Sequence, residues 1–557
     1  MAALTELPWQ PIYDELGVAV PPLDDRPLGY FIEEHAANRP DAVALQYLDR
    51  EISYRELNEL ANRCANSLLS LDVGRGDVVG IHLPNVPQYV VALVACCKIG
   101  CAGSGVSPLL SPGEVAYQIA DAGIGVLLSL DNLAVSVLTR IEEQPACLRH
   151  VIVTSAADHL APSLGVDCDI SGVQVHRYLD LLESASPRYF QRDTDPHDTM
   201  MVQYTGGTTG SPKGAELTIR NLMYNGLQTS ACAPWTTYGE FVATAFPLFH
   251  AAGLAFVLIS LRYGGRFFLI PDPRDVAHFC RQMQRYPPTR LAAVPSLYQL
   301  LLACPEIADV DFSQLRTATC GAAPLAAQER RKIESVFGAN KLTDVFGMTE
   351  TGPVHVSNPP MRARAAAVGI PVPGADIRIV DVETGTREMP PGEAGEIISS
   401  GPQVMKGYLN LPAESARALR QWRGRTWMYT GDIGYMDEEG YVYVCDRAKD
   451  MLVVGGYKVF SVEVEDKLQA LDCVASSAVI GTADAARPGN DVVNLYVELT
   501  PAAAKRDPAG VEKEILAFCR QNMAPYKVPK VLRFIEQIPL TSVGKIDKKA
   551  LRARLAD

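Results

Sequence analysis

The stretch that decides the fold is residues 200–214, which read MMVQYTGGTTGSPKG. Its first five residues are apolar or favour β-structure, and they predict a buried strand. The next ten hold four glycines, three threonines, one serine and a single lysine, Lys213. Glycine allows the backbone to approach a ligand closely, and successive N–H groups in such a turn form a concavity that suits an anion. We therefore expect a strand that leads into a polyphosphate-binding loop, with Lys213 supplying positive charge.

This loop differs from the Walker phosphate loop, in which a Gly-Lys-Ser/Thr sequence opens a helix. Here Pro212 precedes Lys213 and Gly214 follows it, so we expect no helix to begin at the lysine. A flexible surface linker is the alternative for a Gly/Ser/Thr run. Linkers rarely follow a buried strand, and this favours the ligand-binding interpretation.

Composition limits the class of protein. A chain of 557 residues predicts two to four domains or subdomains, and 48% apolar with 21% charged residues is typical of a globular protein. Acidic residues exceed basic ones by 64 − 51 = 13, which argues against a nucleic-acid partner. The thirteen cysteines include no CxxC pair, so we expect reduced core residues and no metal-ligand cluster. We expect a monomer or a homodimer.

Two segments bear on localisation. The N-terminal residues MAALTE have neither the basic region nor the apolar core of a secretory signal. The uncharged run at residues 241–261 is interrupted by Pro247 and His250, and its clean apolar part is too short to span a bilayer. We expect a cytoplasmic protein and leave a peripheral contact with the inner membrane open.

Strand-like and helical segments alternate along the first third of the chain. Residues 78–83, 126–130 and 151–154 are short apolar runs typical of buried strands. The sequence SYRE at 53–56 forms a capping box, and apolar residues then follow helical spacing to Leu68. Strands that alternate with helices predict an α/β architecture with largely parallel sheets.

Three later segments carry side chains suited to a nucleotide. The sequence DVFGMTETG (344–352) contains Phe346, whose ring can stack on a base, and Glu350, whose carboxylate can hold Mg²⁺ against phosphate. The sequence GAAPL (321–325) has small side chains that leave room for a flat or long ligand. Asp432 follows a predicted strand and a glycine, where its carboxylate can accept two ribose hydroxyls.

Two further segments are ambiguous on their own residues. In isolation, His250 of FPLFHAAG (246–253) indicates a satisfied core histidine. The basic loop PLTSVGKIDKK (539–549) is equally typical of a solvated tail.

Taken in order, these motifs resemble those of the adenylate-forming superfamily, which includes acyl-CoA synthetases, adenylation domains of peptide synthetases and beetle luciferases. The resemblance covers the chain from about residue 30 to residue 553. It implies a large N-terminal domain of parallel-sheet α/β subdomains with a small β-barrel-like region, and a small, mobile C-terminal α/β domain. We expect an AMP-binding domain at 1–448 and a mobile domain at 449–557.

The resemblance implies a two-step reaction with ATP, Mg²⁺ and CoA as cofactors. A carboxylate attacks the α-phosphate of ATP and gives an acyl-adenylate and pyrophosphate. The thiol of CoA then displaces AMP and leaves a thioester. For the second step, the resemblance implies that the C-terminal domain rotates about Lys449 and removes Lys545 from the reacting centre.

The resemblance also assigns roles by motif position. Catalysis is assigned to Lys545, Glu350, Lys449 and His250, and Mg²⁺ is assigned to Thr205 and Glu350. ATP or AMP binding is assigned to Thr205, Gly206, Gly207, Thr208, Thr209, Gly210, Lys213, Gly321, Ala322, Phe346, Gly347, Thr349, Asp432 and Arg447. The acyl pocket is assigned to His250, Gly253, Ala323 and Met348. The CoA path is assigned to Gly455 and Gly456, whereas Lys548 and Lys549 are expected at the surface.

The motifs leave the chemical class of the substrate carboxylic acid open. Amino-acid-activating relatives carry Phe-Asp-x-Ser where residues 249–252 read FHAA, so a substrate ammonium would have no partner. Residues 401–405, 446–451 and 526–530 look most like bacterial fatty acyl-CoA ligases, which favours a medium- or long-chain fatty acid. Aryl-CoA ligases of the coumarate or benzoate type share the sequence GMTE (347–350). An acyl-AMP ligase that loads a carrier protein, and a luciferase-like oxidase, are further alternatives.

Overall fold

The computed structural model describes residues 7–160, 168–191, 194–205, 211–323, 325, 327–364, 366–455, 457–484, 487, 490–540 and 546–554. The chain divides into two compact units. Unit 1 comprises Met1–Asp376 and Ser399–Met428, and unit 2 comprises Ile377–Ile398 and Tyr429–Asp557. The expected boundary at Lys449 falls inside unit 2 and stays a prediction.

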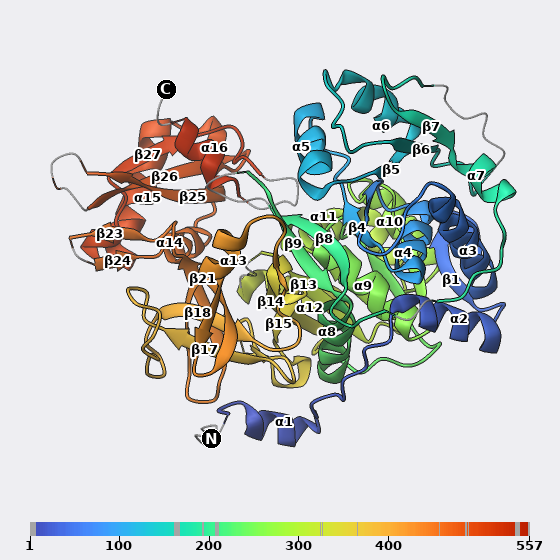
Figure 1. Cartoon of the computed structure of the whole chain (residues 1–557). Coiled ribbons are helices and arrows are strands. Elements are labelled where there is room, and N and C mark those ends of the chain that lie inside the picture. The colour runs from blue at the N-terminus through green and yellow to red at the C-terminus, as the bar shows by residue number, and fades with distance from the viewer. Residues whose placement is uncertain are drawn as a thin grey trace. The chain divides into compact units, whose positions relative to one another are not determined.

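A mixed sheet forms one layer of unit 1, with nine strands among the described residues (Figure 1). Its order is β16-β15-β14-β13-β12-β10-β11-β1-β2. The pairings from β14 through β1 are parallel, whereas β2, β15 and β16 pair antiparallel. The strands are β1 (Val43–Tyr47), β2 (Arg50–Ser53), β10 (Phe241–Thr244), β11 (Arg266–Leu269), β12 (Arg290–Ala293), β13 (Thr317–Gly321), β14 (Leu342–Gly347), β15 (Val354–Ser357) and β16 (Ile370–Pro371).

A second mixed sheet of unit 1 has eight strands within the described ranges, in the order β19-β9-β8-β4-β3-β5-β6-β7. The pairings from β8 through β7 are parallel, and β9 and β19 pair antiparallel. The strands are β3 (Val78–His82), β4 (Ala102–Gly105), β5 (Val126–Leu130), β6 (His150–Thr154), β7 (Gln174–Arg177), β8 (Thr199–Thr205), β9 (Lys213–Thr218) and β19 (Gly407–Tyr408). Largely parallel sheets with helices between the strands confirm the predicted α/β class.

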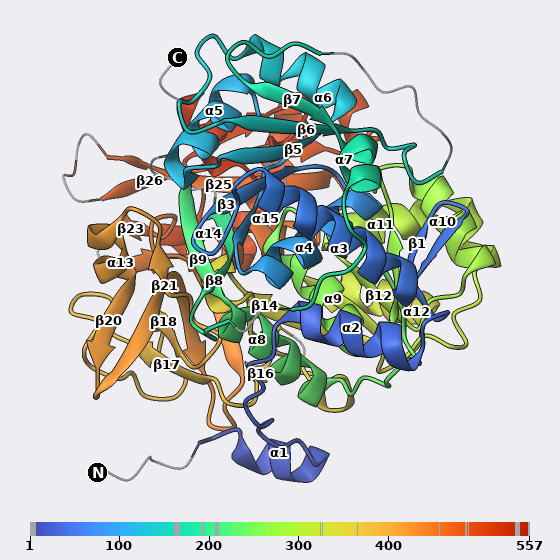
Figure 2. The ribbon, with the colours of Figure 1, turned by 45° about the vertical axis from the view of Figure 1, so that its right-hand side comes forward.

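The two sheets share one core through two apolar helices (Figure 2). All thirteen residues of α4 (Pro87–Ile99) are buried, and α9 (Ala251–Arg262) is buried along most of its length. A helix that is apolar all round belongs in a protein interior. One hydrophobic cluster joins both helices to Ile81 of β3 and Phe267 of β11.

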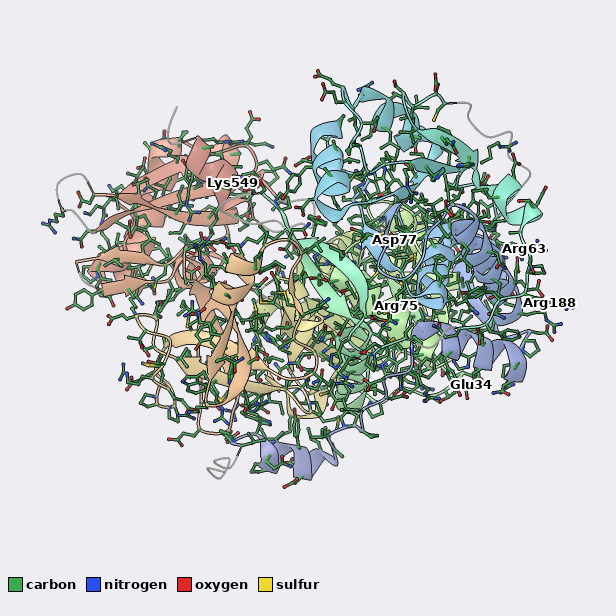
Figure 3. All side chains as sticks on the ribbon, viewed as in Figure 1. Glu34, Arg63, Arg75, Asp77, Arg188 and Lys549 are labelled. Atoms are coloured by element: carbon green, nitrogen blue, oxygen red, sulfur yellow. The ribbon has the colours of Figure 1, made fainter. Side chains whose placement is uncertain are left out.

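The capping box predicted at 53–56 is only half formed in the structure. At the start of α3 (Tyr54–Ser70), Ser53 Oγ accepts the Glu56 N–H at 3.2 Å, while the Glu56 carboxylate pairs with Arg50. Arg63 of α3 donates to the carbonyl oxygens of Leu182 and Ala185, which fixes α3 against the end of α7 (Figure 3). The remaining helices are α1 (Gln10–Leu16), α2 (Leu28–Asn38), α5 (Pro112–Ala122), α6 (Asp131–Ser136), α7 (Tyr178–Ser184), α8 (Ile219–Cys232), α10 (Val276–Arg285), α11 (Pro295–Ala303), α12 (Ala327–Phe337) and α13 (Pro412–Ala418).

Unit 2 contains a smaller α/β core. Strands β25, β26 and β27 form a sheet in which β25 and β26 pair antiparallel and β26 and β27 pair parallel. Val464, Leu495 and Ile515 lie in its hydrophobic cluster. The elements are β22 (Val442–Arg447), β23 (Leu452–Val454), β24 (Tyr457–Val459), α14 (Ser461–Leu468), β25 (Val474–Ala483), β26 (Asp491–Leu499), α15 (Pro508–Asn522), β27 (Val531–Phe534) and α16 (Lys548–Ala553).

The chain passes between the two units within β17 (Asp376–Val380), β18 (Gly395–Ser400) and β21 (Arg425–Met436). A short strand, β20 (Leu419–Trp422), pairs with the first residues of β21. As predicted for core residues, the thirteen cysteines are buried or half-buried. Within the described ranges, every helix falls short of the length and apolarity that a bilayer span requires.

A buried charge cluster lies at the start of β10. The Glu240 carboxylate lies 3.1 Å from Arg290 Nε and 2.9 Å from Arg316 Nη1. The side chains of Glu240 and Arg290 are 0% and 5% exposed. Burial alone would raise the pKa of Glu240, but Arg290 and hydrogen bonds from neighbouring threonines outweigh burial and lower it. Burial of the Glu240 carboxylate is therefore favourable only when the Arg290 guanidinium lies beside it.

Replacing Glu240 by alanine tests this cluster. We expect Glu240→Ala to lower the free energy of unfolding by about 3–5 kcal/mol, because the Arg290 guanidinium is left buried without its carboxylate. Urea unfolding followed by tryptophan fluorescence measures the change, since the Arg290 guanidinium lies 4.3 Å from the centroid of the Trp235 ring. As a control, Asp41→Ala removes the exposed partner of Arg55 and should leave the midpoint unchanged. Equal midpoints for the two variants would contradict the prediction.

Candidate active site

The carboxyl ends of the parallel strands gather the predicted site residues of the nine-stranded sheet. Strands β10, β12, β13 and β14 pair parallel in succession, so they end at one edge. His250 and Gly253 follow β10, Ala323 follows β13, and Met348 follows β14. Ligands of α/β proteins bind outside the carboxyl ends of such strands. The topology thus brings the four predicted acyl-pocket residues to one edge.

The backbone is crowded at this edge. A Cβ atom on Gly347 would lie 1.8 Å from the Pro353 carbonyl oxygen, and one on Gly253 would lie 2.2 Å from the Pro247 carbonyl oxygen. Side chains do not fit at such distances. Glycine at these two positions is therefore required by packing.

His250 caps the helix that follows β10. Its Nδ1 accepts the Ala252 N–H at 3.3 Å, and its carbonyl oxygen accepts the Leu254 N–H at 3.0 Å. The imidazole is half-buried. The histidine thus positions the start of α9, and its role toward a substrate stays a prediction.

The residues predicted for adenine lie at the ends of two adjacent strands. Gly321 is the last residue of β13, and Ala322 follows it with a left-handed φ of 68°. Phe346 lies near the end of β14 and is half-buried. Thr349 opens the short 3₁₀ helix Thr349–Thr351. Because β13 and β14 are neighbours in the sheet, these residues share one region of unit 1.

Glu350 has a buried and oriented carboxylate. The residue is 5% exposed, and its Oε1 accepts the Tyr408 hydroxyl at 2.7 Å. Its carbonyl oxygen accepts the Met405 N–H at 2.9 Å. Tyr408 belongs to β19 at the edge of the eight-stranded sheet, so this bond joins the predicted metal ligand to the sheet that carries the glycine-rich loop.

The glycine-rich loop connects two antiparallel strands. Strand β8 ends at Thr205, β9 begins at Lys213, and these two residues are register partners. The expectation that no helix begins at Lys213 is confirmed. Five of the predicted phosphate-binding residues lie outside the described residues, namely Gly206, Gly207, Thr208, Thr209 and Gly210.

Lys213 is held by a carboxylate from a distant part of the chain. Its Nζ lies 2.6 Å from Glu414 Oε2 of α13 and 5.0 Å from the centroid of the Tyr408 ring. The hydrogen bond from Lys213 is the main reason that the pKa of Glu414 is lowered. Lys213, Tyr408 and Glu350 therefore form one connected set.

Unit 2 brings the predicted ribose-binding residues together. Asp432 of β21 and Arg447 of β22 are register partners, and Arg447 Nε lies 2.6 Å from Asp432 Oδ1. The Asp432 side chain is 4% exposed and that of Arg447 is 41% exposed. Arg447 thus orients the buried Asp432 carboxylate, while its own guanidinium reaches solvent.

The predicted hinge and CoA path also belong to unit 2. Lys449 is exposed in the turn that follows β22. Gly455 has a left-handed φ of 61° between β23 and β24, and no heavy atom lies within 4 Å of a Cβ placed there. Gly456 and Lys545 lie outside the described residues. The flanks of the 541–545 segment are joined by a β-bridge between Leu540 and Ile546.

One expectation for the C-terminal lysines is wrong. Lys548 was expected at the surface, but its Nζ lies 2.8 Å from Glu465 Oε1, with side chains 13% and 11% exposed. Burial raises the pKa of Glu465, and the neighbouring Lys548 ammonium partly opposes this rise. Lys549 is exposed, as expected (Figure 3).

Family models match most of the chain. The model described as AMP-binding enzyme matches residues 32–409, and the model described as AMP-binding enzyme C-terminal domain matches residues 463–545. The chain belongs to the AMP-binding enzyme family. It is an AMP-forming acyl-CoA synthetase of the adenylate-forming superfamily, as the motif resemblance implied.

Relatives of this AMP-binding enzyme match over nearly its full length. A long-chain-fatty-acid–CoA ligase of Bacillus subtilis is 33% identical over 95% of both chains. A feruloyl-CoA synthase of Amycolatopsis is 31% identical over 95% of this chain and 99% of its own. The structure of ATP-bound MatB from Rhodopseudomonas palustris has a TM-score of 0.81 and 28% identity, covering 96% of this chain and 99% of its own.

Sequence reasoning missed two residues of the AMP-binding enzyme's candidate site. Glu414 pairs with Lys213 across 201 positions, and Tyr408 bonds Glu350 across 58 positions. No local pattern predicts either partner. The sequence shows only that a tyrosine follows Gly407 in a turn-rich segment and that a carboxylate lies in the first turn of α13.

Removing the Tyr408 hydroxyl tests whether Glu350 must be oriented for catalysis. Hydrogen bonds to charged groups contribute about 1.5–3 kcal/mol, so we expect Tyr408→Phe to slow pyrophosphate release about tenfold or more. Tyr54→Phe is the control, because it removes a buried phenol bond of 2.7 Å to the Gly265 carbonyl, away from the predicted site residues. Wild-type turnover in Tyr408→Phe would show that the bond serves packing alone.

Proposed function

We propose that this AMP-binding enzyme joins a medium- or long-chain fatty acid to CoA. The observation that carries the proposal is the 33% identity, over 95% of both chains, with a long-chain-fatty-acid–CoA ligase. The segment after β10 supports it, because His250 and small apolar residues stand where an amino-acid substrate would need a carboxylate for its ammonium.

In the first half-reaction the acid's carboxylate attacks the α-phosphate of ATP. A bond forms between the carboxylate oxygen and that phosphorus, and the bond to the β-phosphate oxygen breaks as pyrophosphate leaves. Two anions must meet, so Lys213 and the loop N–H groups are proposed to hold the β- and γ-phosphates, and Lys545 to bridge the carboxylate and the α-phosphate. No general base is required, because the carboxylate is ionised at neutral pH.

The donor set in unit 1 fits Mg²⁺ shared with ATP. Mg²⁺ is bound in proteins by one or two carboxylates together with substrate phosphates. Glu350 offers one buried carboxylate, and Thr205 ends the strand that leads into the loop. Within the described ranges there is no group of three or more His, Cys, Asp or Glu side chains that could hold a metal alone. Bound there, Mg²⁺ would neutralise phosphate charge.

The remaining predicted residues fix the nucleotide and admit the thiol. We propose that Asp432 accepts the ribose hydroxyls, with Arg447 orienting its carboxylate, and that Phe346 stacks on adenine. In the second half-reaction the CoA thiol loses its proton to solvent and its sulfur attacks the acyl carbonyl carbon. The bond from that carbon to the phosphate oxygen breaks, and AMP leaves. The exposed turn at Lys449 suits a hinge that changes domain orientation, and Gly455 and Gly456 would line the pantetheine path.

An aryl acid is the second candidate. A feruloyl-CoA synthase is 31% identical over 95% of this chain, close to the identity with the fatty-acid ligase. The half-buried Ala323 and Met348 suit a ring as well as an alkyl chain. The two candidates differ in the acid alone.

A substrate screen tests the function. We expect pyrophosphate release with fatty acids of medium or long chain, and an acyl-CoA product when CoA is present. Aryl acids and amino acids, assayed in parallel with and without CoA, are the comparison. The highest kcat/KM on an aryl acid would move the assignment to the second candidate. Product that appears only on a carrier protein would exclude CoA as the acceptor.

Two variants should separate the half-reactions. Lys545→Ala should reduce acyl-adenylate formation by at least about a hundredfold and spare thiolysis of supplied acyl-AMP, because electrostatic contacts at the reacting centre have effects of this size. Lys449→Pro should spare acyl-adenylate formation and impair thioester formation, since proline restricts the backbone torsion of a hinge. Pyrophosphate release and thioester formation are measured separately. Equal loss of both half-reactions in Lys449→Pro would argue against the hinge, and unchanged pyrophosphate release in Lys545→Ala would refute its role.

A further inference from the structure

Glu414 of α13 forms an ion pair with Lys213, the lysine that follows the glycine-rich loop. Its Oε2 lies 2.6 Å from Lys213 Nζ, and the side chains of both residues are 29% exposed. Lys213 is the first residue of β9, and Glu414 lies in the first turn of α13, so both belong to regular elements of unit 1. Within the protein itself, the lysine ammonium therefore already has a carboxylate partner.

The helix that carries Glu414 is fixed to the strand that carries Lys213. Strand β19 pairs antiparallel with β9, and Tyr408 belongs to β19. The Ser415 hydroxyl of α13 accepts the Tyr408 N–H at 2.8 Å. The fold thus holds the two backbones close together, and the ion pair follows from this arrangement.

The ATP phosphates require the same ammonium. Lys213 is proposed to hold the β- and γ-phosphates, which are anions, as the Glu414 carboxylate is. Two like charges about 4 Å apart repel each other, and they do so more strongly in a partly buried site than in water. Binding of a phosphate at Lys213 is therefore favoured when the Glu414 carboxylate moves away from the ammonium.

Both members of the pair have a second partner. Arg417 Nη1 lies 2.5 Å from Glu414 Oε1, and these two residues are three positions apart on α13. The Arg417 side chain is 75% exposed, so the carboxylate can turn with it toward solvent. Lys213 Nζ lies 5.0 Å from the centroid of the Tyr408 ring. Separation of Glu414 from Lys213 therefore leaves neither charge isolated.

We propose that Glu414 is the counterion that ATP displaces from Lys213, and that it pairs with the lysine again when pyrophosphate leaves. The inference rests on the proposed role of Lys213 in the first half-reaction and adds a residue that sets the affinity for the two outer phosphates. Competition from Glu414 weakens ATP binding and, by the same contact, promotes the release of pyrophosphate. Glu414 acts through Lys213 and is a positioning residue.

Ligand titration of the full chain tests the inference. Glu414→Gln removes the charge and keeps the size of the side chain, and Glu414→Ala is a second variant with the same expected direction. By calorimetry we expect the Kd for ATP with Mg²⁺, and that for inorganic pyrophosphate, to fall by about fivefold, the size expected for a partly exposed ion pair. AMP lacks the outer phosphates, so its Kd should change by less than about twofold. In turnover assays, added pyrophosphate should inhibit Glu414→Gln at lower concentrations than wild-type protein.

Two comparisons isolate the contact between Glu414 and Lys213. In a Lys213→Ala background, Glu414→Gln should leave the Kd for pyrophosphate unchanged, because the effect requires both partners. Glu216→Gln removes a carboxylate of β9 that pairs with Lys406, and it should leave the Kd values of all three ligands as in wild-type protein. AMP binding with the wild-type Kd also reports that a variant is folded.

The contrary outcomes are distinct. Weaker ATP binding in Glu414→Gln would show that Glu414 orients Lys213 for the phosphates, and unchanged Kd values would show that the two anions do not compete. An equal shift for AMP, or a shift that persists in the Lys213→Ala background, would reflect net charge alone. Each of these results would overturn the inference while the proposed function stands. Unchanged binding of ATP and pyrophosphate in Lys213→Ala alone would instead defeat the proposed role of the lysine.

Discussion

The absence of a side chain at Gly347 is the constraint on which the candidate site depends. The Pro353 carbonyl occupies the place of a Cβ, and the Met348 N–H donates to it at 2.9 Å. This close approach lets the chain reverse after β14 and return as β15. The reversal carries Glu350 at its turn and places His355 at the start of the returning strand. The absence of a side chain at Gly347 thus permits the turn that holds Glu350, the proposed metal ligand.

In each unit, a charged side chain proposed to bind ATP forms an ion pair with another residue of the protein. Lys213 is engaged by Glu414, and Asp432 by Arg447. A pair of this kind holds long side chains in one geometry, so less conformational entropy is lost when a ligand is bound. In the proposed reaction, the ATP phosphates would replace Glu414 as the partner of Lys213, whereas the Arg447–Asp432 pair would remain and orient the carboxylate for the ribose. The excess of acidic residues over the whole chain is compatible with such local arrangements.

Local patterns were sufficient for much of the fold and insufficient for the contacts of the site. The run at 126–130 became β5 with the same bounds, because short apolar runs leave few alternatives. The bonds from Lys213 to Glu414 and from Tyr408 to Glu350 join residues that only the tertiary fold brings together. Lys548 was misjudged for the same reason, since its partner Glu465 lies in another helix.

The complete burial of α4 has a consequence for biosynthesis. Its residues 87–99 leave the ribosome early, but the cluster that covers them includes Phe267 of β11 and Met428 near the end of unit 1. Until those later segments emerge, a helix with no polar face has nothing to pack against on one side. Exposed apolar surface of this kind is prone to aggregation and is what chaperones bind. The nascent chain is therefore expected to need shielding for most of the translation of unit 1, although the finished enzyme leaves no part of this helix accessible.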